Sequence, residues 1–491
     1  MIKLIYKKQS RFINLNDFKR KTMTTDKINY DVCIIGAGIA GATMAAYLAK
    51  QGKKIAVIER NLSERNVIIG ELLQPGGVQR LQEMGFESFL DDIDAQPVYG
   101  YDMIFEGKDT HIPYPKTNGE PSGYGFRNGA FLQNIRKYIL AQDNITVIEA
   151  RVTALIEKDD KVMGVQFLRK QATDEETIYT DLTIVADGPM SRFREQLSKP
   201  DKKVNGYFLG LLLKNCELPF PNHGHMVMGD HPPFVIYPVT TSAWRILIDF
   251  KGETPPKVGP DFKEFLLETF EKFIPQSARA SFVAAVEEGN FKMFPNHRLP
   301  AAPIKKAGAV LLGDSLNMRH PLTGGGMTAV FADVMNLAEN LETVKDFSNV
   351  KAVSKAVQKY YDTRHLGVQT TNILADGLYG VVYHPDLRRA FFEYVSRGGK
   401  YAEETISILA GLNRNKKLLK KHFIGLASYG TKKKLQTANI KEMGDSYGMV
   451  KEAVHIITPL LLDEKPDMAT RLMLKTLAKG EAVINDINFR I

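Results

Sequence analysis

The chain has 491 residues, of which 44% are hydrophobic and 25% are charged. This composition excludes a disordered or fibrous protein, and the length is too great for a single hydrophobic core, so two or three domains are expected. The net charge of +9 predicts contact with an anionic surface, whether lipid, nucleic acid or an acidic protein. The only cysteines, Cys33 and Cys216, exclude a disulfide framework, and no Cys/His spacing predicts a metal site, which fits a reducing compartment.

The first 28 residues are basic and only patchily apolar. Their apolar content is too short for a membrane-spanning helix, and they lack the apolar core of a secretory signal. We expect a flexible tail. The alternative is an amphipathic segment that lies on a membrane surface or directs the chain to mitochondria.

A glycine-rich turn between a strand and a helix is the strongest local pattern in the chain. The sequence predicts an apolar strand at 32–35, the turn GAGIAG at 36–41, an alanine-rich helix to about residue 50 and a second strand at 54–58. This order is typical of a dinucleotide-binding βαβ unit, although it does not separate FAD from NAD. The alternative is a glycine-rich turn in an ordinary βαβ unit.

Each glycine of this turn has a mechanical reason. Gly36 permits the tight turn, Gly38 lets the backbone approach a pyrophosphate, and Gly41 lets the helix pack closely on the strand. The helix N-terminus offers amides and a positive dipole end to the phosphates. Glu59 follows the second strand, where an acid can bind both hydroxyls of an adenosine ribose.

Three later segments place polar groups at the ends of elements. GELLQPGG at 70–77 precedes a predicted helix at 78–84 and presents Glu71 and Gln74, although alone it would be a simple loop–helix junction. An apolar strand that includes residues 183–186 ends in Asp187-Gly188, and another at 309–312 ends in Gly313-Asp314 before a glycine-rich turn and a helix. Asp314 is therefore predicted at the sheet edge where ligands bind, beside amides that can stabilise negative charge on a reduced flavin.

The three strand-ending motifs, GxGxxG with its distal acid, DGxxSxxR and GD, resemble in this order the FAD-dependent monooxygenases of the para-hydroxybenzoate hydroxylase type. The stretches 70–77 and 317–328 are similar to signature stretches of the squalene monooxygenase (squalene epoxidase) family. The resemblance covers roughly residues 30–400.

The resemblance implies a site for FAD and a neighbouring substrate cavity. Together with the motifs, it implies that the following residues bind the cofactor: Gly36, Gly38, Ile39, Ala40, Gly41, Glu59, Arg60, Arg136, Val152, Asp187, Asp314 and Met327. It implies that Tyr101 and Gln74 are the catalytic pair between flavin and substrate, and that Tyr237 lines the cavity.

Two arginines of the family are replaced in this chain. Val67 stands where the family has an arginine before the Gly-Glu pair, and Arg65 is the nearest candidate substitute. Ala130 stands where the family has a second arginine, with Arg127 nearby.

No Ser-His-Asp, Cys-His or carboxylate pair stands out, and a flavin monooxygenase does not need one. The cofactor carries the difficult step, while the protein positions it and excludes water. For His320, beside Pro321, a structural role in the turn is favoured over acid–base work, and Trp244 is interpreted as a packing residue.

The predicted fold class is α/β: a Rossmann-type FAD-binding domain with an inserted β-sheet substrate domain and a C-terminal helical region. The expected boundaries are a tail at 1–28, the first part of the FAD-binding domain at 29–200 with cavity elements near 95–123, the substrate domain at 201–300, the second part of the FAD-binding domain at 301–361, and the helical region at 362–491. An amphipathic helix is expected at 262–273.

The segment 413–426 combines a lysine cluster with bulky apolar residues. It is interpreted either as an interfacial helix on anionic lipid or as the solvated face of a packed helix. The longest late apolar run, at 453–462, is too short to span a membrane. Membrane contact would therefore be monotopic, and the resemblance implies the cytosolic face of the endoplasmic reticulum, with lipid droplets as a further location.

Three functions remain in view. The first is epoxidation of squalene to (S)-2,3-oxidosqualene in sterol biosynthesis, with electrons that the resemblance implies come from NADPH through NADPH-cytochrome P450 reductase, since no second GxGxxG supplies an NADPH domain. The second is a related flavin hydroxylase or reductase of a phenol or another isoprenoid. The third is a non-catalytic prenyl-binding carrier like the Rab GDP-dissociation inhibitors. No nucleic-acid partner and no metal are expected.

Overall fold

The structure of this chain, a computed structural model, describes residues 13–14, 30–116, 122–437 and 448–464. Most of the expected N-terminal tail therefore lies outside the described residues. Its one described element is the short strand β1 (Ile13–Asn14), which pairs in parallel with β9 (Ile145–Lys158).

The first sheet carries the predicted βαβ unit. Its strands follow the order β1–β9–β10–β11–β2–β3, with β17 paired to β11 and β3 also paired to β9. Strands β2, β3, β11 and β17 are parallel, as the motif requires. Their bounds are β2 (Tyr30–Ile35), β3 (Ile55–Glu59), β10 (Lys161–Arg169), β11 (Glu176–Val185) and β17 (Ala309–Leu311).

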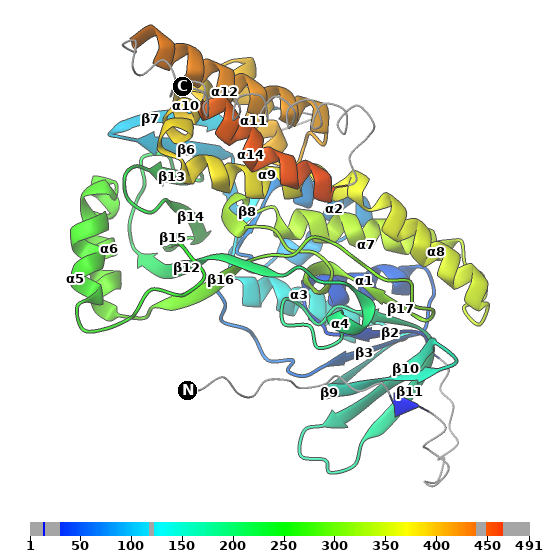
Figure 1. Cartoon of the computed structure of the whole chain (residues 1–491). Coiled ribbons are helices and arrows are strands. Elements are labelled where there is room, and N and C mark those ends of the chain that lie inside the picture. Colours follow the sequence, from blue (N-terminus) through cyan, green and yellow to red (C-terminus); the bar gives the residue numbers. More distant parts are fainter. Residues whose placement is uncertain (1–12, 15–29, 117–121, 438–447, 465–491) are drawn as a thin grey trace, which may run out of the picture.

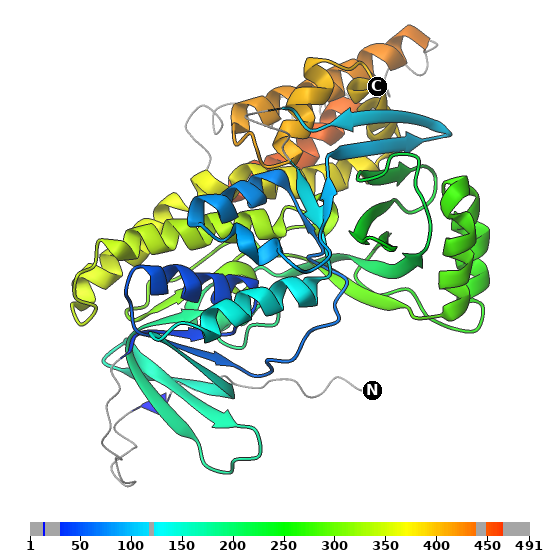
Figure 2. The same cartoon turned by 180° about the vertical axis from the view of Figure 1, so that it is seen from behind.

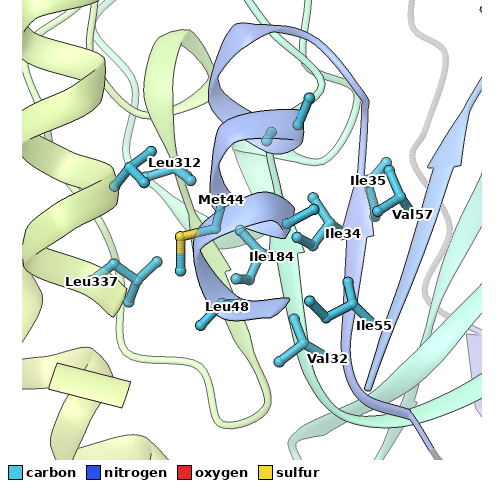
Figure 3. Close-up of a cluster of buried hydrophobic side chains, with 14 of the residues drawn as sticks. Val32, Ile34, Ile35, Met44, Leu48, Ile55, Val57, Ile184, Leu312 and Leu337 are labelled. Carbon is cyan, nitrogen blue, oxygen red and sulfur yellow. The ribbon is translucent and has the colours of Figure 1, made fainter. Parts of the chain in front are cut away.

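Helices α1 (Ile39–Lys50) and α7 (Gly326–Glu342) pack with this sheet around one apolar core. Met44 and Leu48 of α1 lie between Ile34 of β2 and Leu337 of α7 (Figure 3), and all four side chains are fully buried. Helix α3 (Asn128–Leu140) packs beside α1 and contributes Phe131 and Ile135 to the same core.

A second sheet, of order β16–β12–β15–β14–β13–β6–β7, is assembled from two separated parts of the chain. Strands β6 and β7 come from the region near 95–123, and β6 pairs in parallel with β13, so that Tyr101 lies opposite Gly224. The bounds are β6 (Gly100–Phe105), β7 (Lys108–Pro113), β12 (Lys203–Lys214), β13 (Gly224–Met228), β14 (Phe234–Thr240), β15 (Ala243–Lys251) and β16 (Lys292–Arg298). The apolar residues alternate along these strands, so the sheet has two buried faces with separate cores.

One face of the second sheet packs against α5 (Phe262–Phe270) and α6 (Gln276–Glu288), and Trp244 lies in this core, as its interpretation as a packing residue requires. The helix expected at 262–273 ends earlier, at Phe270, and continues as a 3₁₀ turn (Glu271–Phe273). A third, small sheet of order β4 (Leu72–Leu73), β8 (Gly123–Gly125) and β5 (Gln96–Val98) contacts β14 of the second sheet and helix α2 (Pro75–Met84).

The other face of the second sheet is covered by the C-terminal helices (Figures 1 and 2). These helices are α9 (His365–Tyr383), α10 (Pro385–Val395), α11 (Lys400–Leu409), α12 (Lys416–Thr437) and α14 (Gly448–Asp463), whereas α8 (Val350–Thr363) packs on α7 in the core of the first sheet. Among the described helices, none combines the length and apolar content needed to cross a membrane.

Helix α12 contains the lysine cluster, and its apolar residues divide between two environments. Leu419, Phe423 and Leu426 are buried against the other C-terminal helices, whereas Ile424 is 54% exposed. The packed-helix interpretation therefore accounts for the buried side of α12, and Ile424 remains on the outside beside the exposed Lys417 and Lys421.

Helix α2 begins earlier than expected, at Pro75 rather than Val78, and ends at Met84. Proline is well suited to the first position of a helix, because its missing N–H has no intrahelical partner there. The next two residues are also part of the helix, and both are glycines because a side chain has no room there. A Cβ on Gly76 would lie 2.4 Å from the Gly411 carbonyl oxygen. The predicted Pro-Gly-Gly loop is thus a close packing contact of α2.

The glycines of the first turn provide a matched test of packing. A Cβ on Gly41 would lie 1.9 Å from the carbonyl oxygen of Gly36, whereas a Cβ on Gly38 meets nothing within 4 Å. We therefore expect Gly41→Ala to lower the unfolding temperature of the ligand-free protein by several degrees, because overpacking costs about 1–3 kcal/mol, while Gly38→Ala leaves it nearly unchanged. Thermal unfolding followed by circular dichroism checks this, and equal unfolding temperatures for the two variants would contradict it.

Candidate active site

The three loops that follow β2, β11 and β17 meet at one edge of the first sheet. These strands are neighbours in register, with Ile35 opposite Val185 and Val185 opposite Leu311, so their carboxyl ends coincide. A Cβ on Gly36 would lie 2.5 Å from the carbonyl oxygen of Ala186, and a Cβ on Gly313 would lie 2.7 Å from the Ala40 Cβ. The structure therefore brings the loops of Gly38, Asp187 and Asp314 together, as the sequence predicted.

Arg194, the arginine of the DGxxSxxR motif, ties the second of these loops to the third. Its guanidinium donates to the carbonyl oxygens of Gly188 at 3.1 Å, Asp314 at 3.0 Å and Ser315 at 2.8 Å. The carboxylate of Asp187 accepts from the backbone N–H of Arg192 at 2.9 Å through Oδ2, while its buried Oδ1 has no partner among the described residues. Burial raises the pKa of Asp187 from its ordinary value.

Glu59 lies where the adenosine half of a dinucleotide is expected. Its buried carboxylate accepts from the backbone N–H of Ala37 at 2.8 Å and approaches the guanidinium groups of Arg65 at 3.4 Å and Arg136 at 3.8 Å. Arg136 also donates to the Ala37 carbonyl at 3.0 Å, and its Nη2 has no hydrogen-bond partner within the described chain. Arg65, the candidate substitute for the arginine replaced by Val67, thus reaches this acid.

The remaining predicted cofactor residues occupy different positions. Ile39 and Ala40 form the first turn of α1, and Met327 lies in the first turn of α7, where it lines a cavity. Val152 is buried in β9, within the core of the first sheet. The side chain of Arg60 is exposed.

Asp314 presents its carboxylate to a cavity with about 960 Å³ of empty space. The carboxylate accepts no hydrogen bond from the described residues, and its pKa is raised by burial and lowered in part by Arg319 and Arg194. Around one sheet edge lie an open position at Gly38, an Arg136 Nη2 without a hydrogen bond, the Asp187 Oδ1 without a partner among the described residues, and the Asp314 carboxylate. This arrangement fits a bound flavin dinucleotide, which would supply the missing partners.

The cavity wall opposite Asp314 comes from the second sheet and includes Tyr101, Val235 and Tyr237. A second chamber, with about 490 Å³ of empty space, lies between this sheet and helices α9, α10 and α11. Its lining is almost entirely apolar and includes Met103, Phe391 and Ile406. Tyr101, Val235 and Leu322 line both spaces, so they form the partition between them.

The orientation of Tyr101 is fixed by the side-chain amide of Gln74. The amide nitrogen of Gln74 donates to the Thr323 carbonyl at 2.8 Å and to the Tyr101 hydroxyl at 2.9 Å, while its oxygen accepts from the Tyr114 hydroxyl at 2.6 Å. Because a carbonyl can only accept, Thr323 sets the orientation of the amide. The Tyr101 oxygen therefore accepts from Gln74, and its own O–H remains a donor at the partition, with the Tyr114 hydroxyl as a neighbouring hydrogen-bonding group.

Burial raises the pKa of Tyr101 to about 12, with the hydrogen bond from Gln74 opposing the shift. The hydroxyl is therefore protonated throughout the physiological pH range. It can donate a hydrogen bond but does not act as a base there.

Tyr237 packs against a buried ion pair that the sequence did not predict. Arg245, opposite Tyr237 across β14 and β15, donates to the Glu71 carboxylate at 2.6 Å and 3.4 Å, and both side chains are almost completely buried. Arg127 approaches Glu71 at 3.5 Å and does not reach Glu59. The one sequence feature that could have indicated this ion pair is the single arginine, Arg245, within the apolar run Trp244–Leu247. No sequence feature indicated that Tyr114 would bind Gln74.

His320 has the structural role expected of it. Its Nδ1 accepts from the backbone N–H of Leu322 at 3.2 Å, and its ring stacks on Tyr379 with centroids 4.0 Å apart. The ring therefore holds the turn that leads into Gly324 and α7.

Comparison with known proteins agrees with this geometry. The family model for squalene epoxidase matches residues 179–445, and the model for FAD-dependent oxidoreductases matches residues 31–65. The fold is similar to that of a flavoprotein/dehydrogenase from Cytophaga hutchinsonii, with a TM-score of 0.64 and 17% identity over 84% of this chain and all of that one. This likeness supports a Rossmann-type FAD-binding architecture.

Two relatives match over most of their length. Squalene epoxidase 3 of Arabidopsis thaliana is 40% identical over 88% of this chain and 84% of its own length. Squalene monooxygenase of Mus musculus is 34% identical over 88% of this chain and 78% of its own length. On the evidence of the converging loops, the family model and these relatives, the chain is a member of the squalene epoxidase family of FAD-dependent oxidoreductases.

Proposed function

We propose that this chain is an FAD-dependent monooxygenase that epoxidises squalene to (S)-2,3-oxidosqualene in sterol biosynthesis. The observation that carries the proposal is the apolar chamber that meets the Asp314 cavity at Tyr101. A long hydrocarbon chain fits such a lining, because burial of apolar surface supplies its binding free energy. The relatives named above act on squalene according to their names.

The residues of the sheet edge would hold FAD in the cavity. Gly38 leaves room for the pyrophosphate, Glu59 and Arg136 lie at the adenosine end, and Asp314 faces the cavity from the third loop. Bound and reduced FAD supplies the activation of oxygen. The protein contributes position and the exclusion of water, since the partition residues Tyr101, Val235 and Leu322 are each buried.

Tyr101 and Gln74 are assigned as the positioning pair of the site. The Tyr101 hydroxyl lies at the boundary between chamber and cavity and accepts from Gln74, so its O–H can donate a hydrogen bond to an oxygen atom there. Gln74 keeps that hydroxyl in place through its contacts with Thr323 and Tyr114.

The alternatives fit the described residues less well. A phenolic substrate needs polar partners, yet the chamber offers only Thr405 besides the Tyr101 hydroxyl. A non-catalytic prenyl carrier has no use for the unsatisfied Asp187 Oδ1 or for the Asp314 carboxylate that faces the cavity at the edge of the first sheet. Another isoprenoid remains the second candidate substrate.

Electrons are proposed to come from NADPH through NADPH-cytochrome P450 reductase, on the cytosolic face of the endoplasmic reticulum membrane. The net charge of +9 suits an acidic protein partner and an anionic lipid surface. The exposed Ile424, on α12 beside Lys417 and Lys421, suits shallow, monotopic contact with such a surface. Lipid droplets would offer the same kind of contact.

The test of the proposal is a reconstitution with purified components. The FAD-loaded protein is incubated with squalene, NADPH, oxygen and the reductase, and 2,3-oxidosqualene is measured by mass spectrometry. Product is expected only when the reductase is present. Oxidation of NADPH without the reductase, accompanied by hydroxylation of a phenol, would instead identify an aromatic hydroxylase.

Replacing Tyr101 tests the assignment of the partition hydroxyl. We expect Tyr101→Phe to lower turnover roughly fivefold or more while FAD stays bound, because a lost hydrogen bond costs about 1 kcal/mol. Tyr207→Phe is the matched control, since its hydroxyl contacts only the Glu253 carbonyl outside the site. Unchanged turnover of Tyr101→Phe would remove Tyr101 from the active site.

Replacing Asp314 tests the third loop. Asp314→Ala is expected to weaken FAD retention by about tenfold or more, since hydrogen bonds to a charged group contribute about 1.5–3 kcal/mol. Asp314→Asn keeps the size of the side chain and one acceptor oxygen, so it should fall between the wild type and Asp314→Ala. The flavin absorbance that remains after gel filtration measures retention, and full occupancy in Asp314→Ala would count against the assignment.

A further inference from the structure

A polar pocket lies on the other side of the segment that borders the Asp314 cavity. Asn66 lines this pocket, and Ile69, Gly70 and Glu71, a few residues later, line the cavity. The pocket has about 610 Å³ of empty space. One short segment, 66–71, therefore borders both spaces, as do strands β15 and β16.

Four cationic side chains from four different elements converge on this pocket. Arg127 precedes α3, Lys214 ends β12, Arg245 lies in β15 and Lys292 begins β16. They converge because the second sheet meets the start of α3 in the folded chain. The cluster therefore could not be predicted from any local sequence pattern.

The carboxylates around the pocket do not balance these cations. Glu71 is shared by Arg245 and Arg127, and Glu288 pairs with Lys214 at 2.8 Å, where both side chains are about half exposed. Lys292 has one hydrogen bond, from Nζ to the Asn66 carbonyl oxygen at 3.2 Å. Two positive charges are thus left without a matching carboxylate.

The environment of Lys292 reflects this imbalance. Its pKa is lowered, first by partial burial and then by the neighbouring guanidinium groups of Arg245 and Arg127, with Glu71 acting in the opposite direction. Like charges held together in this way are unfavourable unless an anion joins them. Arg245 is only 3% exposed, and its guanidinium is held in place by hydrogen bonds to Glu71 and to the Leu211 carbonyl oxygen at 3.1 Å.

We propose that this pocket binds a phosphate-bearing anion, a phosphate monoester or a diphosphate, through Lys292 and Arg127. A phosphate ester carries a charge of about −1.5 to −2 at neutral pH, which matches the two unbalanced positive charges. Charge-assisted hydrogen bonds from ammonium and guanidinium groups are the strong contacts that such an anion makes. The pocket takes a free diphosphate or the phosphate end of a nicotinamide nucleotide.

Binding of pyrophosphate to the FAD-loaded protein, measured by isothermal titration calorimetry at low ionic strength, tests this proposal. The wild type is expected to bind pyrophosphate, and Lys292→Gln to bind it roughly tenfold more weakly, because it loses a charge-assisted contact. Lys203→Gln is the matched control: it removes the same charge from β12 of the same sheet, at a site paired with Asp201 and outside the pocket. Lys292→Arg retains the charge and should restore most of the affinity.

The outcomes separate the sources of the anion. Binding of NADPH, but not NADH, that depends on Lys292 supports a 2′-phosphate ligand, and equal Lys292-dependent binding of both supports the nucleotide diphosphate. Binding of pyrophosphate alone supports a free diphosphate. The proposal is overturned if the wild type binds none of the three, or if Lys292→Gln and Lys203→Gln bind pyrophosphate equally while both retain the wild-type unfolding temperature and FAD.

Discussion

The close approach of helix α1 to strand β2 is the constraint on which the site depends. Gly41 lies so near the Gly36 carbonyl that no side chain fits there. Gly36 itself has a φ of +99°, which favours glycine. This approach brings the N-terminus of α1 to the ends of β2 and β11. Ala40 then contacts Gly313, and Arg194 fastens the loops of Gly188 and Asp314 to each other.

A buried ion pair holds the second sheet against the segment that lines the cavity. Glu71 and Arg245 lie far apart in the sequence and are both removed from water, which is costly unless the charges are paired and hydrogen-bonded. Two contacts from one guanidinium meet this requirement. The pair holds the segment before Leu72 against β15, so the first and second sheets share one wall of the cavity.

The parts of the fold that the sequence predicted are those with local patterns. The β2–α1–β3 unit follows from apolar runs and glycine offsets, and the meeting of Asp187 and Asp314 follows from the rule that parallel strands end at the same edge. The pairing of β6 with β13 had no such pattern, since Tyr101 and Gly224 are brought together only by the tertiary fold. Tyr114 and Arg245 were missed for the same reason: their partners, Gln74 and Glu71, lie 40 and 174 residues away.

The amide of Gln74 has a mechanical consequence for the whole site. Its amide nitrogen and its oxygen are both engaged: the nitrogen with Thr323 and Tyr101, and the oxygen with Tyr114, which stands beside Tyr101 at the end of the β6–β7 hairpin. The position of the Tyr101 ring at the apolar chamber is therefore tied through one side chain to the turn that precedes α7. One amide thus joins the side chain at the partition to the turn beside Gly324, which lines the Asp314 cavity.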